Sequence, residues 1–179
     1  MRYEEFRKRI VELQTYWKLF KVEFVDRDVF GRFANQLSSE VQDYNTICIT
    51  GYFSETIRKE VEALIRLGKK VKLICPDFPV KSKRDKRNLQ ALKNLVDAGV
   101  EIKINNRLHA RFLVAYTPEL KSGILVIGSF DFNTECIGRE RYDAGIKTRN
   151  PDLISSTVNL FKQVWNASES KSLNERYKL

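Results

Sequence analysis

The sequence has little of several residue types, and each shortage excludes a class of protein. Only one histidine and three cysteines occur among 179 residues, and the cysteines lack metal-ligand spacing. No apolar run approaches the roughly 18 residues of a membrane-spanning helix. The first twenty residues carry Glu4, Glu5 and Glu12 and lack the apolar core of a signal peptide. We therefore expect a cytoplasmic protein without a membrane span, in which Cys48 and Cys75 are buried thiols.

Positive charge is what the chain has in excess. It carries 32 lysines and arginines against 23 acidic residues, a formal net charge of +9, and 42% of its residues are hydrophobic. Such an excess attracts polyanions, so nucleic acid or an anionic membrane is a reasonable partner. A solvated basic surface without a partner explains the same composition.

Apolar periodicity predicts alternating strands and helices. Strands are expected over 20–25, 46–53, 69–76, 100–105, 109–116, 123–130 and 142–148, and helices over 3–20, 28–43, from Ser54 to Gly68, through 89–96 and from Pro151 onward. This alternation favours an α/β fold with βαβ crossovers and a sheet covered on both faces. We expect an amphipathic helix over 1–20, a single domain over 21–167 and a loosely docked tail over 168–179.

The chemically suggestive residues lie in the two expected strands 109–116 and 123–130. In the segment LHARFL, strand alternation would place His109 and Arg111 side by side on one face. The second strand ends at Gly128 and Ser129, where a glycine lets backbone approach a ligand and a hydroxyl can donate to an oxyanion. Histidine, arginine, hydroxyl and glycine backbone together describe a phosphate site. A lone surface histidine is the alternative.

These residues also carry a resemblance to a known family. The order LHARFLVAY, VIGSFDF, YDAGI resembles the phospholipase D superfamily, whose motif reads HxK, then D, then GS or GG, x, N. The similarity covers roughly residues 24–165 and implies a mixed β-sheet sandwiched between helices. Members carry two motifs in one chain or one motif in each subunit of a dimer. With one motif here, the resemblance implies a homodimer with a composite site.

The motif is altered at several positions. Arg111 stands where the family has lysine, Tyr116 where it has aspartate, and Asp131 where it has asparagine, with Asn133 two residues further on. The glutamate that follows in the family corresponds to Asp143, or to Glu140 if the alignment shifts. Arginine keeps the positive charge and can grip a phosphate with two hydrogen bonds. A carboxylate at Asp131 would repel a phosphodiester unless Arg111 or Arg139 pairs with it.

The resemblance implies a metal-independent reaction without a cofactor. One His109 would attack phosphorus and form a phosphohistidine, and the His109 of the second subunit would act as acid and then as base. Arg111 and Ser129 would hold the non-bridging oxygens, while Asp131, Asn133 and Asp143 complete the predicted catalytic set. Gly128 is expected to contact substrate through its backbone.

A basic segment suggests the substrate. Residues 81–87 (KSKRDKR) are expected to form a loop after a parallel strand, at the sheet edge where α/β sites collect. We expect this loop to form a nucleic-acid groove that leads to His109, and a flexible solvated loop is the alternative. Its predicted substrate-binding residues are Lys81, Lys83, Arg84, Lys86 and Arg87. Tyr52 and Phe53 are core or rim aromatics, or stack on bases.

Three functions follow from these observations. The first is a metal-independent phosphodiesterase, a nuclease. The second is a catalytically degenerate dimer that binds nucleic acid without cutting it, favoured by the changes at Arg111, Tyr116 and Asp131. The third is a phospholipase or phosphatidyl transferase, for which the sequence offers no anchor. Hydrolysis that survives a chelator and needs His109 separates the first from the second, and liposome pelleting tests the third.

Overall fold

The computed structural model describes residues 4–5, 22–53, 55–120, 122–131 and 143–178. Most of the expected N-terminal helix, the proposed cap Ser54, and Asn133, Arg139 and Glu140 lie outside these ranges.

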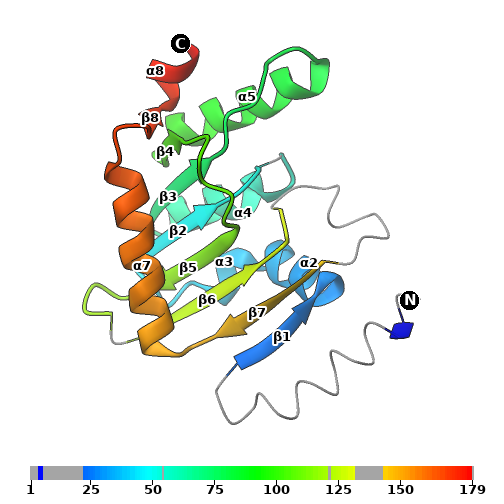
Figure 1. Cartoon of the computed structure of the whole chain (residues 1–179), viewed down its shortest axis with the longest axis vertical. Coiled ribbons are helices and arrows are strands. Elements are labelled where there is room, and N and C mark those ends of the chain that lie inside the picture. The colour runs from blue at the N-terminus through cyan, green and yellow to red at the C-terminus, as the bar shows by residue number, and fades with distance from the viewer. Residues whose placement is uncertain (1–3, 6–21, 54, 121, 132–142, 179) are drawn as a thin grey trace.

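The described strands form one eight-stranded mixed sheet in the order β1-β7-β6-β5-β2-β3-β4-β8 (Figure 1). Their bounds are β1 Val22–Asp26, β2 Thr46–Thr50, β3 Lys70–Cys75, β4 Glu101–Ile104, β5 Phe112–Tyr116, β6 Gly123–Gly128, β7 Ala144–Thr148 and β8 Lys171–Ser172. The pairs β2–β3 and β3–β4 are parallel, as the predicted βαβ crossovers require. The other pairs are antiparallel.

Helices cover both faces of this sheet, as predicted. Their bounds are α2 Arg27–Asn35, α3 Leu37–Glu40, α4 Glu55–Arg66, α5 Lys83–Asp97, α7 Pro151–Asn166 and α8 Leu173–Tyr177. Apolar side chains of α2, α3, α4 and α5 share one core with the sheet. Ile154, Val158 and Phe161 of α7 form the second core on the opposite face, where α7 crosses the front of the sheet in Figure 1. No helix in the described ranges is both long and apolar enough to cross a membrane.

Several predicted elements differ in their bounds, and the backbone explains two of these differences. The helix expected over 28–43 is divided at Gln36, whose backbone (φ −123°, ψ 21°) leaves the helical region between α2 and α3. The strand expected over 46–53 ends at Thr50, because Gly51 adopts a φ of +134° and turns the chain away from the sheet.

The cysteines Cys48 and Cys75 are buried and free, as the sequence predicted. Burial raises the pKa of both thiols to about 12. Neither is therefore a thiolate nucleophile near neutral pH, because the reactive form is the thiolate.

The C-terminal segment was expected to be loosely docked, and that expectation is wrong. Strand β8 pairs antiparallel with β4, and Leu173 is buried against the core. Asn105 donates to the Ser170 hydroxyl across 2.8 Å. Arg176 pairs with Asp77 in the β3–α5 connection, where it is the main cause that lowers the pKa of that carboxyl. Apart from Leu173 and Tyr177 the tail is mostly polar, so much of its docking rests on hydrogen bonds that periodicity cannot reveal.

The ionisation of the Tyr177 hydroxyl should make the stability of the docked C-terminal segment depend on pH. Its hydroxyl lies 2.9 Å from an Asp77 carboxylate oxygen and accepts from the Phe78 backbone N–H at 3.3 Å. Burial is the main cause that raises the pKa of Tyr177 to about 12, against about 10 in an unfolded chain. Because the folded pKa is the higher one, this contribution to stability is complete below about pH 10 and is lost as the pH rises toward 12.

We expect Tyr177→Phe to lower the free energy of unfolding by about 1 kcal/mol at neutral pH, since it removes the hydroxyl's hydrogen bonds. Between about pH 9 and 11 the wild type should lose more stability than the variant. Urea unfolding at both pH values measures this, with Tyr52→Phe, an exposed tyrosine, as the control. Equal losses in wild type and Tyr177→Phe would contradict the assignment.

Candidate active site

His109 and Arg111 precede strand β5 and do not lie on it, which corrects the predicted strand over 109–116. The pairing of β2 with β5 ends at Thr50 and Phe112. Beyond that point the buried Thr50 hydroxyl replaces the next strand partner: it donates to the Ala110 carbonyl at 2.8 Å and accepts from the Phe112 N–H at 3.0 Å. Residues 109–111 are therefore a loop fixed by Thr50, and strand alternation does not set their directions.

Thr50 holds the loop that carries His109, a role that the sequence pattern did not reveal. Thr50→Val keeps the shape of the side chain but removes the hydroxyl, so the Ala110 carbonyl and the Phe112 N–H lose their hydrogen-bond partner. We expect a loss of about 1–3 kcal/mol in the free energy of unfolding. Chemical denaturation measures this loss. Thr157→Val is the matched control, because the Thr157 hydroxyl makes an exposed hydrogen bond to the Leu153 carbonyl within α7. Equal stability of the two variants would contradict this role.

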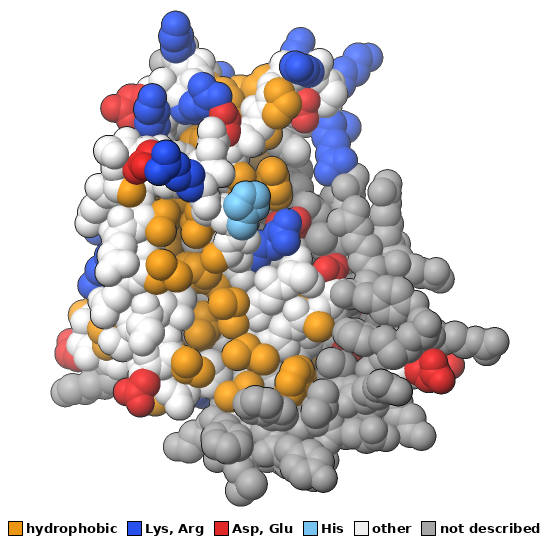
Figure 2. All heavy atoms as spheres, in the orientation of Figure 1, with side chains coloured by type: hydrophobic (Ala, Val, Ile, Leu, Met, Phe, Trp, Pro, Cys, Tyr) orange, Lys and Arg blue, Asp and Glu red, His pale blue; other side chains and the backbone are white. Residues whose placement is uncertain are grey.

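The predicted site residues His109 and Arg111 line one small hollow together with Gly51, Tyr52 and Pro76. His109 is exposed, and Figure 2 shows the single histidine on the surface beside a basic side chain. An exposed imidazole on a fixed loop can reach a substrate phosphate.

Arg111 pairs with Asp131, as the sequence analysis considered. The Arg111 Nε lies 2.6 Å from an Asp131 carboxylate oxygen, and the two side chains are 35% and 11% exposed. The same oxygen lies 3.4 Å from the Tyr52 backbone N–H. A Cβ on Gly51 would lie 3.6 Å from that oxygen and 3.7 Å from the Arg111 Cγ, which are ordinary contact distances, so the ion pair lies directly beside the end of β2.

Gly128 and Ser129 lie beside the same loop. The Gly128 N–H donates to the Arg111 carbonyl at 3.1 Å, which joins the end of β6 to the segment that carries His109. Gly128 faces Gly145 on β7, and a Cβ on it would lie 2.8 Å from the Phe130 ring and 2.6 Å from the Ala144 carbonyl. Packing within the sheet therefore explains the need for glycine here, in place of the predicted approach of a ligand.

The Ser129 hydroxyl is held by Asp143. It donates to one Asp143 oxygen at 2.8 Å and accepts from the Ala144 N–H at 3.2 Å. Asp143 is buried, and its second oxygen has no hydrogen-bond partner in the described part of the chain. The structure thus brings Ser129 and Asp143 together, as it does Arg111 and Asp131.

Tyr116 lies at the far end of β5, away from His109. Burial is the main cause that raises the pKa of its hydroxyl above the ordinary range, and that hydroxyl interacts with Cys48 and Thr46. The departure from aspartate at this position therefore lies at the opposite end of β5 from the loop that carries His109.

The basic segment is not a loop, which corrects a second prediction. Ser82 caps α5 through a capping box with Asp85, so residues from Lys83 onward form its first turns. All five predicted basic residues, Lys81, Lys83, Arg84, Lys86 and Arg87, are exposed, and Lys and Arg side chains gather over this end of the molecule in Figure 2.

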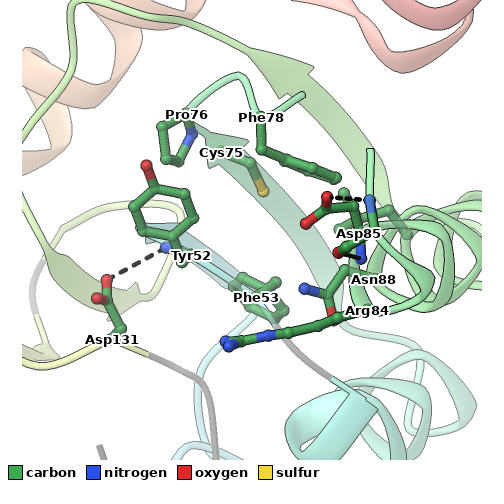
Figure 3. Close-up of a pocket in the computed structure, with 11 residues that line it drawn as sticks. Tyr52, Phe53, Cys75, Pro76, Phe78, Arg84, Asp85, Asn88 and Asp131 are labelled. Atoms are coloured by element: carbon green, nitrogen blue, oxygen red, sulfur yellow. Dashed lines mark hydrogen bonds between the residues drawn. The ribbon is translucent and has the colours of Figure 1, made fainter. Parts of the chain in front are cut away.

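A cavity of about 430 Å³ lies between this end of α5 and the ends of β2 and β3. Arg84 and Asp131 line it, so one basic residue of the segment reaches the neighbourhood of the catalytic candidates (Figure 3). Tyr52 is 42% exposed on its wall and Phe53 is buried. No group of three or more potential metal-ligating side chains occurs within the described ranges.

Comparison with known proteins identifies the family of this chain. The family model described as "Cardiolipin synthase, PLD-like domain" matches residues 37–165. The chain belongs to this PLD-like family, which bears out the resemblance seen in the sequence. A search of the curated proteins finds no significant match.

Solved structures share the fold. The phospholipase D family member Nuc from Salmonella typhimurium has a TM-score of 0.63 at 15% identity, over 84% of this chain and 96% of that one. NucT from Helicobacter pylori has a TM-score of 0.64 at 14% identity, over 85% and 98%. Polyphosphate kinase from Porphyromonas gingivalis has a TM-score of 0.66 at 21% identity over 80% of this chain, which spans only 26% of that chain.

Proposed function

We propose that this protein is a metal-independent phosphodiesterase, a nuclease, that works through a phosphohistidine at a site shared by two subunits. Membership of the PLD-like family supports a phosphodiesterase-like function. The observation that carries the proposal is the exposed His109 on a fixed loop, in one hollow with Arg111 and hydrogen-bonded through that loop to the end of β6.

The first step forms a bond between an imidazole nitrogen of His109 and phosphorus. The bond from phosphorus to the leaving oxygen breaks, and the His109 of the second subunit supplies a proton to that oxygen. In the second step the same histidine takes a proton from water, which attacks phosphorus and releases the first His109. Arg111 and Ser129 hold the non-bridging oxygens, where negative charge accumulates.

The carboxylates keep these donors in place. Asp143 fixes the Ser129 hydroxyl, and its buried second oxygen, which has no partner in the described part of the chain, is left to accept a further hydrogen bond. Asp131 orients Arg111 but also competes with the substrate phosphate for its guanidinium. The exposed bases at the start of α5 attract the polyanion toward His109, and Asn133 belongs to the proposed set.

Subunit mixing tests whether two copies share one site. Wild type and His109→Ala are combined in equal amounts, denatured together and refolded, so that chains pair at random. If each site needs both histidines, only dimers of two wild-type chains are active. The mixture then keeps about one quarter of the activity that wild type alone shows at the same total protein concentration. Retention of about one half would mean that each chain carries its own complete site and would contradict the shared site.

A second function is favoured by one observation, the Arg111–Asp131 ion pair. Because the Arg111 guanidinium is already paired with a carboxylate, it is not free to bind the phosphate that reacts. The site can then bind a nucleic-acid strand at the surface without hydrolysing it. The protein would then be a dimer that binds nucleic acid and does not cleave it. TrmBL2, described as an archaeal chromatin protein with a novel mode of DNA binding, shares the fold at a TM-score of 0.56 and 12% identity. Binding of DNA without hydrolysis in either wild type or His109→Ala would support this function over the first.

A further inference from the structure

We infer that the cavity between α5 and the ends of β2 and β3 is a nucleobase subsite, which takes one unpaired base of a single strand whose phosphate lies at Arg111. The inference rests on the proposed function, because it needs a phosphate at that position. It adds a binding site and a substrate class, single-stranded nucleic acid.

The first argument is position. The cavity shares Tyr52 and Pro76 with the hollow that holds His109. Asp131 lines the cavity and pairs with Arg111, which lines the hollow, so this ion pair joins the two spaces. A substrate whose phosphate contacts Arg111 can therefore place the adjoining nucleoside in the cavity.

The second argument is the chemistry of the walls. Tyr52, Pro76 and Phe78 supply apolar and aromatic surfaces, and Figure 3 shows them lining one side of the space. Bases stack on such surfaces with little regard for sequence. Asn88 adds an amide with both a donor and an acceptor, the groups that pair with the edge of a base.

The third argument is charge. The two carboxylates of the lining are already engaged: Asp85 accepts from the N–H groups of Lys81 and Ser82, and Asp131 pairs with Arg111. The cavity therefore suits an uncharged base. In Figure 3 the Arg84 side chain extends from α5 toward the side where Tyr52 and Asp131 lie, where it can meet the neighbouring phosphate.

The fourth argument is that one wall is held in place. The Phe78 N–H donates to the Tyr177 hydroxyl at 3.3 Å, and the two rings lie 5.6 Å apart. A stacking surface that is already ordered costs less to occupy. The docked C-terminal segment thus supports the cavity from outside.

Size excludes a duplex. A volume of about 430 Å³ lies toward the lower end of small-molecule sites, which span about 300–1,000 Å³. It accommodates one base with part of its sugar and not a base pair. A paired base would first have to leave its stack, at an energetic cost that an unpaired base does not meet.

Binding measurements with and without bases test the subsite. All binding variants carry His109→Ala to prevent cleavage. Fluorescence anisotropy compares a labelled oligothymidylate of about ten nucleotides with an abasic strand of equal length and charge. Phe78→Ala and Asn88→Ala should weaken binding of the oligothymidylate by about tenfold and leave the abasic strand nearly unchanged. Gln90→Ala, on the same helix and outside the cavity lining, should alter neither.

Equal weakening on both strands, or on neither, would overturn the inference. Loss of binding to phosphatidylglycerol vesicles in the same variants, with the oligothymidylate unaffected, would also overturn it and assign the cavity to a lipid headgroup. If Phe78→Ala fails to fold, Asn88→Ala still tests the subsite, because it removes a smaller polar side chain and should disturb the fold less.

A substrate without a base separates this inference from the proposed function. Methyl para-nitrophenyl phosphate is offered in EDTA to chains that retain His109. Asn88→Ala should hydrolyse it as the wild type does. If the wild type hydrolyses it but base-dependent binding is absent, the subsite alone is wrong. If base-dependent binding is present but nothing is hydrolysed, the subsite stands and the nuclease is wrong.

Discussion

His109→Ala is expected to lower phosphodiester hydrolysis by at least about 10⁴-fold, because no other histidine is available as nucleophile or acid. The side chain is exposed, so the substitution should change the free energy of unfolding by less than about 0.5 kcal/mol. The loss of rate would then be chemical. Initial rates on methyl para-nitrophenyl phosphate, with and without EDTA, measure it, and circular dichroism confirms the fold.

Arg107→Ala is the matched control for this experiment. Arg107 is exposed two residues earlier on the same connection and pairs at the surface with Glu169. Its removal should leave the rate on a small diester within about twofold of the wild type, because exposed ion pairs contribute little. An equal rate in wild type and His109→Ala would contradict the assigned nucleophile. Loss of activity in EDTA would contradict the metal-independent reaction.

Asp131→Asn is expected to raise kcat/KM for a phosphodiester by about tenfold. The carboxylate now competes for Arg111 across 2.6 Å, and a neutral amide would leave the guanidinium to the phosphate. A tenfold change corresponds to about 1.4 kcal/mol, a modest share of what a partly buried charge pair can supply. The variant should also be less stable, since it removes one partner of that pair.

The control must separate the effect of losing the Arg111–Asp131 ion pair from the effect of losing one negative charge. Asp152→Asn removes the same charge from an exposed position in the first turn of α7 and should change kcat/KM only slightly, more so at low salt. Asp131→Glu retains the carboxylate and should show no gain. A decrease in kcat/KM for Asp131→Asn would mean that the carboxylate is needed to orient Arg111, and the competition argument would be wrong.

Much of the fold could be predicted because apolar periodicity records burial directly. The segments TICIT and KVKLIC are strands of the buried parallel part of the sheet, and the stretch after Asn150 and Pro151 is a helix with the predicted apolar face. The family resemblance supplied the mixed topology, which alternation alone does not determine. Periodicity could not reveal the C-terminal docking, because Asn105, Asp77 and Tyr177 act there through hydrogen bonds.

The arrangement of the candidate site could be predicted only in part. Residue types selected His109, Arg111 and Ser129 as candidates, and charge compensation named Arg111 as one of two possible partners of Asp131, the one that the structure pairs with it. The loop conformation of 109–111 escaped prediction, because it depends on the Thr50 hydroxyl, sixty residues away from Ala110. The first turns of α5 could not be predicted from apolar periodicity, because nearly all of their residues are charged. The sequence does contain a capping pattern there, Ser82 and Asp85, three residues apart.

Trapping the covalent intermediate tests the central claim most directly. The wild-type protein is mixed with bis(para-nitrophenyl) phosphate in EDTA, quenched in alkali during the first turnover, digested and analysed by mass spectrometry. A para-nitrophenyl phosphoryl adduct on the peptide that contains His109, formed as one para-nitrophenolate leaves and absent from His109→Ala, is the predicted result. Release of para-nitrophenol with no adduct at any time, or with an adduct on another residue, would contradict a phosphohistidine mechanism at His109.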